Sequence, residues 1–126
     1  MTRKKFIAGY MRILTRAMKL SGKALQQGIA SLEDELEDID DELFKQGLRF
    51  VVDGTEPRLI DEIMTNRIAH EKDKQQRILK TVQKRAVLGI QAGENFRVFY
   101  NVLKSMPGLT PKEENKVDME ILFDDD

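Results

Sequence analysis

The stretch that decides the fold is Phe6–Leu25, FIAGYMRILTRAMKLSGKAL, in which apolar residues recur at every third or fourth position. This spacing places them on one face of an α-helix, so the sequence predicts a helix from about residue 4 to residue 27. Gly28 follows, and glycine is costly inside a helix but favourable just past its end. The residues predicted to face the core are Phe6, Tyr10, Ile13, Leu14, Ala17, Leu20 (or Met18), Ala24 and Leu25.

Two shorter helices are predicted next. Ser31-Leu32-Glu33-Asp34 matches the capping-box pattern and predicts a short helix, with Ile39-Asp40-Asp41 as a second start. The helix from that second start contains four regularly spaced apolar residues and stops at the turn pair Asp53-Gly54. The four apolar residues are Leu43, Phe44, Leu48 and Val51.

The remaining chain predicts one long helix, one short helix and a tail. Thr55 is expected to cap the long helix, from about residue 56 to residue 91, which crosses the polar segment AHEKDKQQR at 69–77. Asn95 is expected to cap a last helix that Pro107-Gly108 ends. No segment alternates as a strand would, so the predicted fold is all-α. We expect one compact helical domain of about five helices at residues 1–109, and an acidic, disordered tail at 110–126.

Composition excludes several classes of protein. The chain has 126 residues, enough for one domain, and it lacks Cys, so disulfides, Cys-ligated zinc and cysteine nucleophiles are impossible. Its longest stretch without charge, residues 24–32, is far too short to span a bilayer. These features favour a soluble protein of a reducing compartment.

The near-neutral charge balance, 21 Lys and Arg against 22 Asp and Glu, hides a block layout. Residues 1–30 contain only basic charges, whereas residues 31–44 contain eight acids and no base. Such blocks favour pairing or steering. The pairing could be internal, with the basic first helix against the acidic segment, or it could involve a partner.

Nothing in the sequence predicts catalysis, a cofactor or a metal. His70 is the only histidine and lacks the second histidine of a metalloprotease motif, and no phosphate-binding or nucleophile motif is present. A nucleic-acid interface is not expected either, because Phe6 and Tyr10 lie on the apolar face of the first helix. We therefore expect a protein that is not an enzyme.

Two stretches resemble the MotA family of flagellar-motor stator subunits, of the MotA/TolQ/ExbB class. Residues 28–64, GIASLEDELEDIDDELFKQGLRFVVDGTEPRLIDEIM, resemble its cytoplasmic loop, and residues 86–103, AVLGIQAGENFRVFYNVL, resemble its cytoplasmic tail. The polar segment His70–Arg85 stands where that family has two transmembrane helices, and the two leading ones are absent too. The resemblance is compatible with a natural relative that has lost its membrane part or with an engineered fusion.

The resemblance implies binding to the rotor protein FliG through charged residues of the loop. The family's acidic contact residue corresponds to Glu33, but its arginine falls on Leu25, with Arg16 and Lys23 as the nearest basic substitutes. A second acidic cluster of the family falls on Thr65, Arg67 and Ala69, and the proline that follows Asn95 there is Phe96 here.

The leading hypothesis is a non-enzymatic motor protein, cytoplasmic or peripheral at the inner membrane, that binds FliG or another motor component. Two alternatives are a self-associating helical scaffold and a membrane-surface binder whose Arg3-Lys4-Lys5 acts with Phe6 and Tyr10. The candidate partner-binding residues are the acids Glu33, Asp34, Glu37 and Asp41 and the bases Arg12, Arg16, Lys19 and Lys23.

Overall fold

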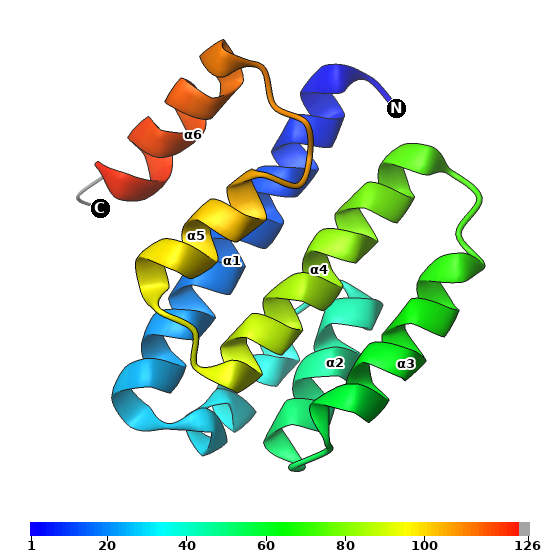
Figure 1. The fold of residues 1–126 in the computed structure, drawn as a ribbon, viewed down its shortest axis with the longest axis vertical. Coiled ribbons are helices and arrows are strands. Elements are labelled where there is room, and N and C mark those ends of the chain that lie inside the picture. Colours follow the sequence, from blue (N-terminus) through cyan, green and yellow to red (C-terminus); the bar gives the residue numbers. More distant parts are fainter. Residues whose placement is uncertain (124–126) are drawn as a thin grey trace.

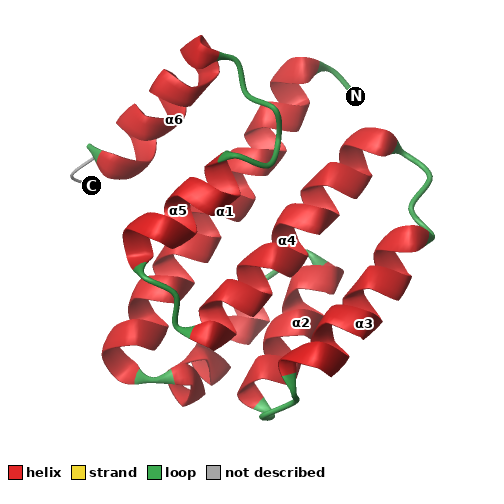
Figure 2. Ribbon diagram, viewed as in Figure 1, coloured by secondary structure: helices red, strands yellow, loops and turns green. Residues whose placement is uncertain are grey.

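The structure is a computed structural model that describes residues 1–123, and its elements are helices (Figure 1). The part of the chain that it describes contains no strand, so the all-α prediction is confirmed (Figure 2). There are six α-helices and one 3-10 helix in this range, against the five expected. They are α1 (Arg3–Gln27), η1 (Ile29–Asp38), α2 (Glu42–Val52), α3 (Pro57–Ala69), α4 (Lys74–Ala92), α5 (Phe96–Lys104) and α6 (Pro111–Leu122).

The first helix forms as its periodicity predicts. The Thr2 side chain accepts a hydrogen bond from the backbone N–H of Lys5, and Gly28 ends α1 at a φ of 89° that favours glycine. Tyr10 on the inner face is fully buried, and its hydroxyl donates to the Leu103 carbonyl of α5 at 2.8 Å. Leu25, however, was predicted to face the core, and 49% of it is exposed near the end of the helix.

The core lies around α4, the helix that contacts α1, α2, α3 and α5. Figure 1 shows α4 in the middle of the molecule, with α1 and α5 on one side and α2 and α3 on the other. Gly47 of α2 allows the closest approach, because a Cβ atom there would lie 2.8 Å from both Met64 of α3 and Val87 of α4. The three helices therefore pack at a point where no side chain larger than hydrogen fits without rearrangement.

The prediction of one continuous helix over residues 56–91 is wrong. The chain forms two helices, α3 and α4, which lie side by side and are joined by residues 70–73 (Figure 1). Asp73 caps α4 by accepting from the N–H of Gln76 at 2.9 Å, and Arg77 donates to the Glu71 carbonyl at 2.8 Å. Because the polar segment has little to bury as a continuous helix, folding back lets the apolar faces on either side of it pack together.

Two predicted helix starts are also wrong. Residues 29–38 form a 3-10 helix, and the Ser31 hydroxyl donates back to the Gly28 carbonyl at 2.6 Å, so the predicted capping box is not formed. Burial of Leu32 and Leu36 holds this segment against the core. Helix α3 starts after Glu56 instead of Thr55, whose carbonyl accepts from the Gln91 side chain at 2.7 Å.

The predicted disordered tail is a helix over most of its length. Thr110 and Glu113 form a reciprocal capping box that starts α6, and Pro111 occupies the first turn. Val117 is 1% exposed, so α6 is packed on the core. The segment was expected to be disordered because it is rich in charge, but burial of Val117 and two ion pairs, Arg3–Glu113 and Lys104–Asp118, order it. The expectation for residues 124–126 lies outside the described residues.

Candidate partner-binding site

A groove runs along the outer face of α1, between α6 and η1. It has a volume of about 1180 Å³, and α1 residues from Arg3 to Leu20 line its length. Its apolar surface comes from Ile7, Ala8 and Met11 of α1, and the nearly buried Leu20 of α1 and Val117 of α6 lie beneath it. We call it the α1–α6 groove. A concave surface of this size, with an apolar floor and charged flanks, is a natural place to look for a binding function.

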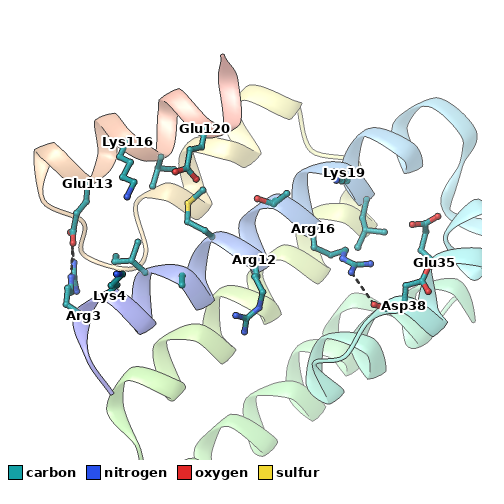
Figure 3. Close-up of a pocket in the computed structure, with 16 residues that line it drawn as sticks. Arg3, Lys4, Arg12, Arg16, Lys19, Glu35, Asp38, Glu113, Lys116 and Glu120 are labelled. Atoms are coloured by element: carbon teal, nitrogen blue, oxygen red, sulfur yellow. Dashed lines mark hydrogen bonds and ion pairs between the residues drawn. The ribbon is translucent and has the colours of Figure 1, made fainter. Parts of the chain in front are cut away.

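Three of the four predicted basic residues line this groove. Arg12, Arg16 and Lys19 follow one another at helical spacing, and Figure 3 shows Arg12 and Arg16 extending from α1 on the side away from α6. The Arg16 guanidinium donates to the Asp38 carbonyl at 3.1 Å, which orients it toward η1. Within residues 1–123, Arg12 and Lys19 form no ion pair with a carboxylate.

Lys23, the fourth predicted base, is paired inside the molecule. Its ammonium lies 2.9 Å from Glu35 of η1, and this hydrogen bond lowers the pKa of the Glu35 carboxyl below its ordinary value. The internal pairing of the basic helix with the acidic segment therefore occurs, but only at this pair and at the Arg16 contact with Asp38. The rest of the basic face is left for other interactions.

The predicted acidic residues lie apart from the groove. Glu33 is exposed and pairs with Arg49 of α2 at 2.8 Å. Asp34 and Glu37 of η1 and Asp41 before α2 are exposed, and none of them forms an ion pair in the described part of the chain. The predicted set of site residues thus divides between two surfaces.

The second wall of the groove was missed in the sequence. Lys116 and Glu120 of α6 point toward α1 in Figure 3, together with Glu113 one turn earlier. The signal that could have located this wall is the pattern Thr110-x-x-Glu113, which marks a helix start. Lys4 of α1 also lines the groove.

The hypothesis that Phe6 and Tyr10 contact a membrane surface is wrong, because both rings are buried. Phe6 is 1% exposed and Tyr10 is fully buried, so neither ring is free to enter a lipid surface. None of the helices in residues 1–123 is both long and apolar enough to cross a membrane.

Hydrogen bonds and ion pairs hold α6 against α1 and α5. The Arg3 guanidinium donates twice to Glu113, at 2.7 and 3.0 Å, and this bonding lowers the pKa of Glu113 to about 2. Toward the other end of α6, Asp118 accepts from the Tyr100 hydroxyl at 2.6 Å and from Lys104 at 3.1 Å. These hydrogen bonds also lower the pKa of Asp118.

Acid is therefore expected to loosen α6 before the core unfolds. The Glu113 pKa is about 2 in the folded chain against an ordinary value of 4.5, so its contribution is complete above 4.5 and is lost as the pH falls toward 2. Amide hydrogen exchange across this window checks the result, with α6 amides losing protection ahead of those in α4. In Glu113→Gln, part of this pH dependence should disappear. An unchanged profile would show that the Arg3–Glu113 pair does not hold the helix.

Comparison with known proteins gives the site a context. No protein-family model matches the chain. It is 34% identical over 76 residues to motility protein A of Treponema phagedenis, a match that covers 60% of this chain and 29% of the relative. It is 50% identical over 48 residues to motility protein A of Borreliella burgdorferi, covering 38% and 18%. The chain is similar in sequence to motility protein A.

A third relative agrees. Motility protein A of Bacillus subtilis is 38% identical over 53 residues, which cover 42% of this chain and 20% of the relative. The predicted resemblance to the MotA family is thus confirmed. The chain spans less than a third of the length of the curated relatives that it matches.

Proposed function

We propose that this chain is a non-enzymatic protein of the flagellar motor, resembling the cytoplasmic part of motility protein A, that binds a rotor or other motor component through charged surfaces. The observation that supports the proposal is its identity to motility protein A, 34% over 76 residues for Treponema phagedenis and 50% over 48 residues for Borreliella burgdorferi. In this proposal the protein acts in the cytoplasm, at the inner face of the membrane where a motor partner would hold it.

Charge on the described surface fits such a role. Arg12 and Lys19 have no carboxylate partner within residues 1–123, and Asp34 and Glu37 have no basic one there. Each exposed ion pair with a partner is worth at most about 1 kcal/mol. Several together set the on-rate and the orientation of docking more than the affinity.

The contact expected from the MotA family differs in this chain. Leu25 stands where the family has its arginine and is 49% exposed, so an apolar side chain replaces a charge at that surface position. Glu33 is kept, but Arg49 already pairs with it. Binding through Glu33 would require exchange of that partner, which exposed ion pairs permit at low energetic cost.

Co-purification with FliG tests the proposal. We expect the full chain to retain FliG at low ionic strength and to lose it as salt rises, because exposed charges are screened. Glu33→Lys should reduce retention. The matched control is Glu56→Lys, a charge reversal at another exposed acid, before α3, whose pair with Arg58 is long at 4.0 Å. Failure to retain FliG or any other motor protein at low salt would refute the proposal.

Self-association is the second candidate. Exposed apolar side chains on α5 and α6 favour it, namely Phe96, Val98, Met119 and Leu122, each between 43% and 56% exposed. The mass from light scattering at high protein concentration distinguishes the two candidates, because a monomer there removes the scaffold role.

A further inference from the structure

We propose that the α1–α6 groove binds an acidic amphipathic helix of a partner protein. The inference rests on the proposed function in taking that partner to be a motor protein, although binding of the helix itself does not depend on it. Four observations support it: the length of the groove, its apolar floor, the excess of free basic charge along it, and the acidic helix that α1 already holds.

The groove has the length and floor of a helix-binding site. The α1 segment from Lys4 to Lys19 spans about 22 Å at 1.5 Å per residue, which equals about four turns of a docked helix. Ile7 and Met11 on its floor are half-buried, so they are reachable from outside. Apolar side chains at helical spacing on a partner would fill such a floor, as in other helix-in-groove complexes.

Free charge along the groove is predominantly positive. Lys4, Arg12, Lys19 and Lys116 line it and form no ion pair within the described residues. Two of its carboxylates are neutralised, Glu113 by Arg3 and Glu35 by Lys23. Glu120 and the Asp38 side chain are the groove carboxylates left without a basic partner there. With Arg16, which donates only to a backbone carbonyl, five groove cations have no ion pair in the described residues, against two such carboxylates, and this excess favours an acidic ligand.

The intramolecular contact of α6 shows the type of helix that α1 accepts. Helix α6 has four acids and two lysines. Its Glu113 pairs with Arg3 of α1, its Asp118 accepts hydrogen bonds from α5, and its buried Val117 lines the groove together with α1 residues. An acidic helix with an apolar face therefore already occupies one side of α1. The α1–α6 groove offers the same combination, an apolar floor with basic flanks, on the side toward η1.

Fluorescence anisotropy with the full chain tests the inference. The probe is a labelled designed peptide of four helical turns, with Leu at positions i, i+3, i+4 and i+7 of each repeat and Glu elsewhere. A second probe replaces every Glu with Lys. We expect the acidic probe to bind at least about tenfold more tightly than the basic one, because several exposed ion pairs act together and reversing the charge of the probe replaces them with repulsions. Equal affinity for the two probes would overturn the proposal.

Variants assign the binding to the groove. Arg12→Glu combined with Lys19→Glu should lower the affinity of the chain for the acidic probe about tenfold or more. The matched control reverses two exposed lysines outside the groove, Lys72 between α3 and α4 and Lys74 at the start of α4, as Lys72→Glu with Lys74→Glu. It should bind as the original chain does. Met11→Gln should also weaken binding, because it makes the floor polar. Circular dichroism confirms that each variant is folded. Unchanged affinity in the Arg12/Lys19 variant, or in Met11→Gln, would overturn the proposal.

The two proposals fail separately. If the chain retains FliG but does not bind the acidic probe, the groove is not the helix-binding site and the motor function stands. If it binds the probe through the groove but retains no motor protein, the groove proposal stands and the proposed function is wrong.

Discussion

Replacing Phe99 with alanine is expected to lower the free energy of unfolding by about 3–5 kcal/mol, the range for truncation of a buried phenylalanine. Phe99 of α5 is 0% exposed and its ring lies against Gly89 of α4. Removing the ring leaves a cavity between two helices of the core, and the cost of that cavity adds to the lost burial of apolar surface. Urea denaturation followed by circular dichroism measures the effect.

The same helix provides the control for this substitution. Phe96 lies one turn earlier on α5 and is 43% exposed. Phe96→Ala should change stability by no more than about 0.5 kcal/mol, as is usual for surface positions. If the two alanine variants lose similar stability, the packing of α5 on α4 described above is wrong.

Gly89→Ala is expected to destabilise the chain, although alanine is the better helix former. A Cβ atom at Gly89 would lie 2.5 Å from Phe99 Cε1 and 2.5 Å from Glu94 Oε1. Glu94 is held by two hydrogen bonds from Arg85, at 2.7 and 2.9 Å, so it does not move away freely. Overpacking should lower the free energy of unfolding by about 1–3 kcal/mol, which exceeds the gain of up to about 1 kcal/mol from the better helix propensity of alanine.

Gly22→Ala is the matched control, because Gly22 also lies inside a helix. Its nearest neighbour to a Cβ atom would be Phe96 Cε2 at 4.0 Å, an ordinary contact. This variant should gain about 0.5–1 kcal/mol from helix propensity. Denaturation curves of the two variants should therefore shift in opposite directions. A shift in the same direction would show that the close approach of α4 and α5 at Gly89 is absent.

Local signals in the sequence predicted the elements that local physics decides. The apolar periodicity located α1, and Gly28, Gly54 and Gly93 ended the helices that they follow. The Asn95 side chain caps α5 as expected, accepting from two backbone N–H groups at 3.0 and 3.2 Å.

What sequence reasoning missed depends on packing between distant segments. Nothing local requires the break between α3 and α4, since the residues around it are good helix formers. Burying the apolar faces of both helices against α2 requires it. Likewise, α6 is ordered by contacts with Arg3 and Tyr100, which are remote in the chain.

The candidate site shows the same division. Arg12, Arg16 and Lys19 were predicted together because helical spacing alone places them on one face of α1. That they form one flank of a groove depends on α6, which was expected to be disordered. Lys23 shares the basic character of these residues, but its pairing with Glu35 could be found only from the tertiary structure.

Competition between FliG and the acidic helical peptide tests the central claim most directly. The full chain is immobilised, loaded with FliG at low ionic strength, and washed with increasing concentrations of the peptide. The account predicts that the peptide displaces FliG from the full chain, and that the Arg12→Glu/Lys19→Glu variant retains little FliG from the start. Full retention of FliG at saturating peptide would contradict the claim that the α1–α6 groove takes the motor partner, because FliG would then bind at another surface, such as the one that carries Glu33.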